Sequence, residues 1–285
     1  MKPAPFKRHL PSTVREAVEI LSEYAPQEGR VIAGGQSLIP MMAFRMARPA
    51  HLIDIAEVDG LDRLTISNDA LKIGARVRHA SFHLPQPCGV LGPLLTSVVK
   101  HIAHYPIRIR GTFCGSIAHA DPSSEWCLVV VTLDAAMIAA STRGDRTIPA
   151  TEYFKGILST ALTEDELLTE VSIPLLPVDT KFGFSEFSRR AGDFAMSAAL
   201  VTYRLDRGRM IDVHLGVGGA EPHPRRITEA EAMLNGEVPG NKLFLAVSDA
   251  VAKAVDAMED HQTSAEYRRN LVRAVVRRAL DRASL

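Results

Sequence analysis

The chain has 285 residues, which suits two or three compact units better than one small core. Its 33 basic and 33 acidic residues cancel to a formal net charge of zero, and this argues against nucleic acid as the main partner because phosphate binding needs a basic surplus. No apolar run has the length of a membrane span, and the N-terminus lacks the apolar stretch of a secretory signal, so we expect a cytoplasmic protein.

The first 58 residues have the pattern of a small β-α-β unit. Thr13 and Glu16 have the spacing of a capping box, and the apolar residues that follow recur at helical intervals up to Tyr24, before Pro26. The pattern further predicts a strand, a short helix capped by Ser37 and a second strand: Arg30–Ala33, Ser37–Met46 and His51–Ile55. The apolar stripe of the short helix is expected in the core: Met41, Met42, Phe44 and Met46.

The pattern of residues 59–176 predicts a second unit that contains both helices and strands. Two alternating segments, Leu61–Ile66 and Ala70–Ala75, flank Asn68 and Asp69 and indicate a hairpin. Further along the chain we expect a helix at Gly92–Ile102, followed by two apolar segments, Trp126–Leu133 and Ala135–Ala140. A polar turn at Ser141–Thr147 and a helix cap at Thr151 come next, and Pro174 ends a strand at Leu167–Ile173.

Residues 177–285 predict a three-stranded antiparallel sheet followed by helices, which makes the whole chain an α+β protein. The expected strands are Phe182–Phe187, Ala198–Leu205 and Ile211–Val217, and the expected helices are Ile227–Asn235, Asn241–Met258 and Ser264–Ala283. Six arginines lie on the last helix, either as a solvated face or as a docking surface for a partner.

Two short stretches rich in small and hydroxyl residues, Ala33–Leu38 and Arg110–Glu125, stand apart from the rest of the chain. Gly111 and Gly115 allow backbone angles that a side chain would forbid, and Thr112 and Ser116 supply hydroxyl donors. Successive backbone N–H groups in such turns converge on anions, most often phosphates. Either stretch alone could equally be an ordinary tight turn or a phosphate-binding loop. The two stretches together indicate two loops that bind one pyrophosphate.

Cysteine and histidine positions argue against a metal site in this chain. Cys88, Cys114 and Cys127 form no C-x-x-C pair, so the chain alone cannot hold a four-cysteine iron–sulfur cluster. His101 and His104 lack a neighbouring carboxylate or thiol and are expected to be structural or surface residues. Cys114 lies inside the second stretch, where we expect a packing residue. We assign no catalytic side chain to the chain.

The two stretches in this order, Ala33-Gly34-Gly35-Gln36-Ser37-Leu38 and Arg110–Ser116 followed by Ala118–Pro122, resemble the FAD-binding medium subunit of the molybdenum hydroxylases. That family includes the flavin subunits of carbon monoxide dehydrogenase, quinoline oxidoreductase and nicotine dehydrogenase. The resemblance covers nearly the whole chain. It implies that residues 1–58 and 59–176 are two parts of a FAD-binding domain and that 177–285 form a separate C-terminal domain.

The resemblance also implies cofactor-binding residues. The first loop supplies Val31, Ile32, Ala33, Gly34, Gly35, Gln36, Ser37 and Leu38, and the second supplies Thr112, Phe113, Cys114, Gly115, Ser116 and Ala118. Glu125 falls near the adenosine part of FAD, Ile102 along the cofactor and Leu168 at the isoalloxazine end. Phe194, in a segment near the flavin ring, stands where carbon monoxide dehydrogenase types carry Tyr. Glu186 stands where several relatives carry Lys, and its role is left open. Asp121 is either a cofactor contact or a turn residue before Pro122.

As a medium subunit, the chain would take electrons from a small subunit with two [2Fe–2S] clusters and pass them through FAD to an external acceptor. A large molybdopterin subunit would hydroxylate the substrate with water, and the complex would be a heterotrimer, itself dimerised. The residues Gly192-Asp193-Phe194 and Glu186 favour an N-heteroaromatic substrate over carbon monoxide. The alternatives are a carbon monoxide dehydrogenase medium subunit and a protein that stores or senses flavin without turnover.

Overall fold

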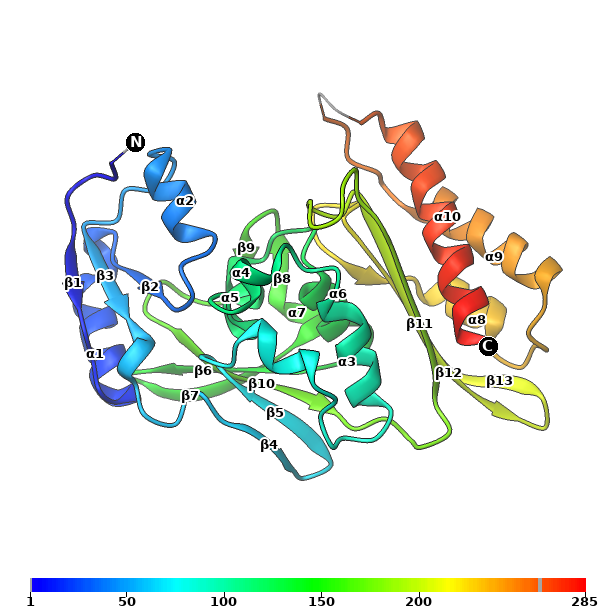
Figure 1. Cartoon of the computed structure of the whole chain (residues 1–285), viewed down its shortest axis with the longest axis horizontal. Helices are drawn as coiled ribbons and strands as arrows, with labels where there is room; N and C mark the ends of the chain where they lie inside the picture. The colour runs from blue at the N-terminus through cyan, green and yellow to red at the C-terminus, as the bar shows by residue number, and fades with distance from the viewer. Residues whose placement is uncertain (1, 261–262) are drawn as a thin grey trace.

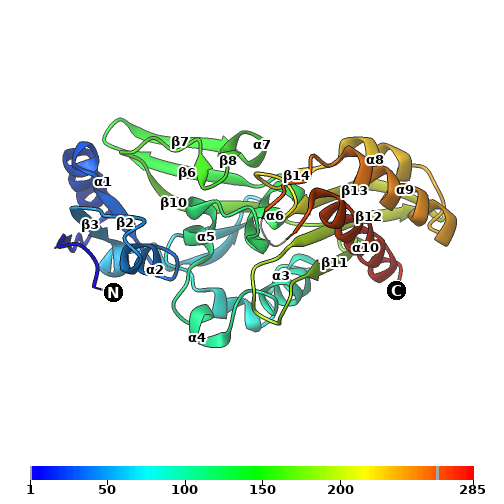
Figure 2. The same cartoon turned by 90° about the horizontal axis from the view of Figure 1, so that it is seen from above.

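The computed structural model describes residues 2–260 and 263–285. Met1, from the predicted unit 1–58, and residues 261 and 262, from the predicted unit 177–285, lie outside the described residues. Three sheets follow one another along the long axis, with the N-terminal sheet at one end, a five-stranded sheet in the middle and the C-terminal sheet at the other end (Figure 1). The view from above shows the same order of the three sheets (Figure 2).

The N-terminal unit is the predicted β-α-β arrangement with an additional strand. Its parallel sheet has the order β1-β3-β2, formed by Lys7–His9, His51–Asp54 and Arg30–Ile32. Helix α1 (Val14–Tyr24) starts as the capping-box spacing predicts, because the Thr13 hydroxyl accepts a hydrogen bond from the Glu16 N–H at 3.1 Å. The Glu16 carboxylate accepts the Ser12 N–H at 2.8 Å, so the cap is closed from both sides.

Helix α2 (Leu38–Ala43) is shorter than predicted, and its methionine stripe does not form core. Met42 is buried, but Phe44 and Met46 are 71% and 76% exposed, so the prediction of a core stripe was wrong for these two. The helix ends before them, and Arg45 adopts a left-handed conformation that turns the chain away. Ser37 occupies the N-cap position without a side-chain hydrogen bond, so the predicted cap is absent.

The middle unit is built on an antiparallel sheet of order β4-β5-β10-β6-β7, with the strands Leu64–Ser67, Ala70–Gly74, Leu167–Pro174, Ala136–Ser141 and Gly144–Pro149. Asn68 and Asp69 both have positive φ, as a tight hairpin turn requires. Its helices are α3 (Leu91–Val99), α4 (Tyr105–Arg108), α5 (Phe113–His119), α6 (Glu125–Thr132) and α7 (Ala150–Tyr153).

Smaller elements complete the middle unit and the connections. A two-stranded ribbon pairs β8 (Phe154–Gly156) with β9 (Ser159–Thr160), and the 3-10 turns are Ala25–Gln27, Ile55–Glu57 and His79–His83. The predicted polar turn is tighter than expected, because β7 already begins at Gly144. Pro149 occupies the N-cap position of α7, so the predicted cap at Thr151 was wrong.

The C-terminal unit confirms the predicted antiparallel sheet and helices. Strands β11 (Lys181–Phe187), β12 (Ser197–Asp206) and β13 (Arg209–Gly218) pair in order, and a two-residue strand, β14 (Arg225–Arg226), extends the predicted three to four. The helices are α8 (Thr228–Leu234), α9 (Asn241–Ala254) and α10 (Ala265–Ala283). Helix α10 packs on β11 and β12, and Gly183 makes this possible because a Cβ there would meet the Ala279 carbonyl.

Several arginines of α10 form hydrogen bonds or ion pairs with other elements of the chain. Arg268 is buried and donates to the carbonyls of Met196 and Gly219 and to the Asp260 carboxylate. Arg273 pairs with Asp249, and Arg282 donates to a carbonyl of β11. The solvated-face prediction therefore fails for Arg268, whose guanidinium holds α10 to the ends of two strands.

Buried apolar side chains gather in two clusters. One runs from α1 through the middle sheet to α6 and on to Leu200 of β12, and the other lies between the C-terminal sheet and α8, α9 and α10. The unit boundaries at 58/59 and 176/177 stay predictions. Among the helices of the described residues, none is both long and apolar enough to span a bilayer.

Candidate functional site

A pocket of about 790 Å³ lies where the N-terminal unit meets the middle unit. Its walls include every residue from Val31 to Leu38 and, from the second stretch, Gly111, Thr112, Cys114, Gly115, Ser116 and Ala118. The two stretches, separated by more than 70 residues in the sequence, therefore face one cavity, as the sequence predicts. Pockets of this size accommodate drug-sized and cofactor-sized molecules.

The second stretch is held in place by the segment just before the 3-10 turn at His79. The Phe113 N–H donates to the Val77 carbonyl at 2.9 Å, and the His79 N–H donates to the Gly111 carbonyl at 3.0 Å. Arg78 and Thr112 thereby form an isolated antiparallel bridge. This short β-like pairing anchors the loop to a segment that leads directly into the buried core.

The two stretches touch through their backbones. A Cβ placed on Gly34 would lie against the Arg110 carbonyl oxygen and 2.7 Å from the Gly111 Cα, closer than real Cβ atoms approach. A residue with a side chain at position 34 would therefore push the loops apart. Gly35 has a φ of 69°, in the left-handed region that glycine favours, and so turns the first loop into α2.

The prediction that Gly111 and Gly115 need unusual backbone angles was wrong, because neither has positive φ. Both glycines instead allow close approach. A Cβ on Gly111 would lie 2.6 Å from His79 Nε2, and one on Gly115 would lie 2.6 Å from the Thr112 hydroxyl. That hydroxyl caps α5 by accepting the Gly115 N–H at 3.0 Å. The second stretch is thus the capped start of a helix, not an extended loop.

The structure divides the predicted cofactor residues into two groups. Leu168 joins the two stretches in the walls of the pocket. Phe113 does not, because its fully buried side chain packs between Phe82 and Trp126. The remaining predicted residues also lie outside the walls, so their contact with a cofactor stays a prediction: Ile102, Asp121, Glu125, Glu186 and Phe194.

Asp121, Phe194 and the wall residue Cys114 differ in their local surroundings. Asp121 accepts the Ser123 N–H at 2.8 Å, which is the geometry of a turn residue and one of the two readings that the sequence left open. Phe194, on the connection between β11 and β12, is 75% exposed. Cys114 is buried with its thiol 3.3 Å from the Ile73 carbonyl, and burial raises its pKa, as expected for a packing residue.

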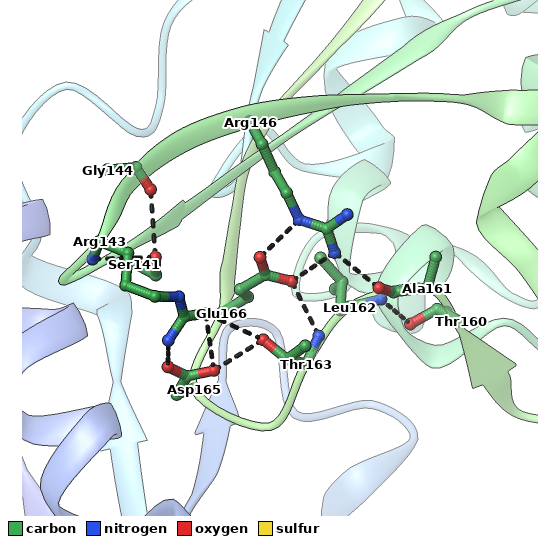
Figure 3. A network of polar contacts seen from close by, with 10 residues as sticks. All are labelled: Ser141, Arg143, Gly144, Arg146, Thr160, Ala161, Leu162, Thr163, Asp165 and Glu166. Atoms are coloured by element: carbon green, nitrogen blue, oxygen red, sulfur yellow. Dashed lines mark hydrogen bonds and ion pairs between the residues drawn. The ribbon is translucent and has the colours of Figure 1, made fainter.

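Sequence reasoning missed several polar wall residues, among them His79 and Glu166. Glu166 is fixed by Arg146, whose Nε and Nη2 donate to its two carboxylate oxygens at 2.6 and 2.8 Å, and by the Thr163 N–H at 2.8 Å (Figure 3). The Arg146 guanidinium lowers the pKa of Glu166. The sequence signal for Glu166 was an acidic residue directly before the apolar pair Leu167 and Leu168. Nothing in the sequence around His79 distinguishes that histidine.

The charges of the wall suit an anionic ligand. Three arginines, Arg30, Arg45 and Arg48, face two acids, Glu28 and Glu166. Because Glu166 is already neutralised by Arg146, the pocket retains an excess of positive charge. This excess suits a diphosphate, and glycine-rich turns like the first loop commonly supply backbone N–H groups to such anions. Pocket and loops thus define a protein that binds a dinucleotide.

Outside the pocket, two carboxyl groups share a buried site between the middle and C-terminal units. Glu125 is the first residue of α6, and Glu186 of β11 has a side chain that is only 3% exposed. The two carboxyls lie close enough that two negative charges there would repel each other. Burial, and then mutual repulsion, raises the pKa of Glu186, and burial raises that of Glu125. The pair therefore holds a proton at neutral pH.

Comparison with known proteins agrees with this site. The family model described as "FAD binding domain in molybdopterin dehydrogenase" matches residues 4–176, and the model "CO dehydrogenase flavoprotein C-terminal domain" matches 182–283. The nicotine 6-hydroxylase medium subunit of Paenarthrobacter nicotinovorans is 38% identical over 96% of this chain and 95% of its own. The caffeine dehydrogenase subunit beta of Pseudomonas sp. is 34% identical over 100% and 96%.

Solved structures give the same result. Carbon monoxide dehydrogenase from Hydrogenophaga pseudoflava superimposes with a TM-score of 0.94 at 31% identity, over 100% of this chain and 99% of that one. Quinoline 2-oxidoreductase from Pseudomonas putida 86 gives 0.93 at 31% identity with the same coverage. The chain belongs to the FAD-binding medium subunits of the molybdenum hydroxylase family, which confirms the resemblance seen in the sequence.

The residues present fit FAD. The glycines at 34, 111 and 115 let the two loops pack closely together, which brings the backbone of both loops to one pocket wall where a pyrophosphate can bind. Leu168 and Leu162 add apolar wall for a ring, and the arginines offset the charge of the phosphates. Within residues 2–260 and 263–285, no group of three or more His, Cys, Asp or Glu side chains is placed to hold a metal ion.

We predict that Gly34→Ala abolishes most FAD binding. The added methyl group would separate the two loops at the Arg110 carbonyl and so widen the phosphate cradle. The measurement is the flavin-to-protein ratio of the purified chain, with circular dichroism to confirm folding. The matched control is Gly218→Ala on β13, where an added Cβ would make only ordinary contacts of 3.4 Å and longer. Wild-type flavin content in a folded Gly34→Ala variant would contradict the loop contact.

We predict that the buried carboxyl pair makes the chain less stable at high pH. The folded chain retains a proton that the unfolded chain releases above about pH 4.5, so this stability is fully present below that pH and decreases as the pH rises toward the raised folded pKa. One retained proton makes the free energy of unfolding decrease by up to about 1.4 kcal/mol per pH unit.

The test compares the unfolding free energies of the wild type and Glu186→Gln from pH 5 to pH 9. The glutamine amide can donate to the Glu125 carboxylate without titrating, so the decrease with pH should be shallower than in the wild type. Glu152→Gln, at an exposed position of α7, is the control and should keep the wild-type slope. Equal slopes in Glu186→Gln and wild type would show that the pair holds no proton.

Proposed function

We propose that the chain binds FAD non-covalently in the pocket between the two loops and works as the electron-transfer subunit of a molybdenum hydroxylase complex. The observation that carries this proposal is the backbone contact of Gly34 with Arg110 and Gly111, which joins both loops at one cavity of about 790 Å³. Bound FAD supplies the redox chemistry, and the protein supplies binding, orientation and electrostatics.

The residues of the chain have distinct tasks in this proposal. The backbone of the two loops binds the pyrophosphate, and the arginines at the mouth offset its charge. Leu162 and Leu168 provide an apolar surface that fixes a ring and excludes water. We place the redox end of the cofactor at Leu168, whereas Ile102, Phe194 and the pair of Glu125 and Glu186 lie outside the walls of the pocket.

We further propose that the electrons come from two [2Fe–2S] clusters in a small subunit and leave to an external acceptor. The chain has three cysteines, all buried and free, so the clusters require another chain. A large molybdopterin subunit would carry the substrate site, and the assembly would be a dimer of heterotrimers. The exposed Phe194 lies on a surface available for such a partner.

For the substrate of the whole complex we propose an N-heteroaromatic compound. The relatives named for nicotine and caffeine, which are both N-heteroaromatics, are 38% and 34% identical to this chain. The two carbon monoxide dehydrogenase medium chains are 29% and 30% identical. This difference supports the heteroaromatic class over carbon monoxide.

We predict that an N-heteroaromatic substrate bleaches the flavin absorbance only when the small and large subunits are present. The experiment is anaerobic stopped-flow absorbance with nicotine or caffeine as probes, on the isolated chain and on the complex. Dithionite, which reduces flavin directly, is the control that the bound flavin is redox-competent. Substrate bleaching in the isolated chain would overturn the electron-transfer role, and no bleaching in the intact complex by any heteroaromatic would favour a flavin-storage protein or another substrate class.

A further inference from the structure

His79 is a buried histidine in the wall of the pocket, at the point where the two loops meet. Its residue surface is 4% exposed, and the fully buried Trp126 of α6 donates its indole N–H to His79 Nδ1 at 2.9 Å. The His79 backbone N–H donates to the Gly111 carbonyl, so the residue is held by its backbone as well as by the contact of its ring with Trp126. Nothing in the cofactor assignments above uses this side chain.

The contact with Trp126 fixes the tautomer of His79. An indole N–H can only donate, so Nδ1 must be the unprotonated acceptor and Nε2 must carry the hydrogen. Burial, and then the positive charges of Arg78 and Arg108, lower the pKa of His79 to about 4. The ring is therefore neutral at pH 7, with one N–H available at Nε2.

That N–H lies beside the second loop. The ring edge with Nε2 packs against Gly111, where a Cβ would lie 2.6 Å from Nε2, and both residues line the pocket. Within residues 2–260 and 263–285, Nε2 has no hydrogen-bond partner. A donor whose orientation is fixed, without a protein partner, at the wall of an anion pocket is placed to donate to an oxygen of a bound ligand.

We propose that His79 is a positioning residue for the dinucleotide, which donates its Nε2–H to a pyrophosphate oxygen, and that Trp126 holds the tautomer that makes this donation possible. This inference rests on the proposed binding of FAD. The pyrophosphate is the part of FAD in question, because Gly111 is also the residue against which Gly34 packs, and the ring therefore lies where both loops converge.

A neutral donor suits this place better than a lysine or arginine. Arg78 and Arg110 already flank the loop, and a further fixed charge in the buried wall would cost desolvation energy. A neutral N–H satisfies a phosphate oxygen without that cost, and its hydrogen bond to a charged acceptor is stronger than one between neutral groups.

The test measures the affinity of flavin-depleted chain for FAD and for ADP, which carries the diphosphate without the flavin. Three chains are compared by calorimetry: wild type, the double variant His79→Phe/Trp126→Phe, and His83→Phe as the matched control on the same 3-10 turn, outside the walls of the pocket. The double variant removes donor and acceptor together, so it leaves no unsatisfied polar group in the core.

We expect the double variant to bind both FAD and ADP about tenfold or more weakly, and the control to bind both like the wild type. Unchanged affinities in the double variant, or weakened FAD binding with unchanged ADP binding, would overturn the contact with the pyrophosphate. If the wild type itself bound no FAD, the proposed function would fail instead, so the two failures are distinguishable.

A measurement on the wild type covers the case in which the double variant does not fold. The ¹⁵N spectrum of histidine-labelled chain reports the tautomer of His79 directly. We expect the hydrogen on Nε2 in the flavin-depleted chain, and a shift of that nitrogen when ADP is added. Hydrogen on Nδ1, or an Nε2 signal that ADP leaves unchanged, would contradict the proposal.

Discussion

The close approach of two backbone segments is the constraint on which the site depends. Gly34, after a strand of the parallel sheet, packs against Arg110 and Gly111, just before the capped helix α5. Each segment is fixed separately, the first by its strand and the second by the hydrogen bonds of residues 77–79 to 111–113. Only a residue without a side chain allows them to meet, and the meeting creates the pocket.

Much of this arrangement could be predicted from the sequence, because it depends on local chemistry. The cap of α1, the hairpin at Asn68 and the C-terminal strands follow from patterns of neighbouring residues. The two loops were predicted from their composition, and the resemblance to the family supplied their shared role. Why positions 111 and 115 need glycine could not be predicted, because the cause is their short distance to His79 and Thr112 and not their backbone angles.

Residues whose role comes from distant partners were the ones that sequence reasoning missed or misplaced. Arg268 resembles a surface charge but is buried against two strand ends. His79 acquires its fixed tautomer from Trp126, 47 residues away, and the pKa of Glu186 is raised by burial and by Glu125 on another unit. No pattern within one element contains these pairs.

The central claim is that both loops bind one FAD molecule, and amide hydrogen exchange tests it most directly. Exchange is followed by mass spectrometry in the flavin-depleted chain and at increasing FAD concentration. The account predicts that residues 32–38 and 111–116 become protected together, at the same FAD concentration, while strand β13 is unchanged. Protection of only one of the two segments, or of neither, would contradict a site built from their contact.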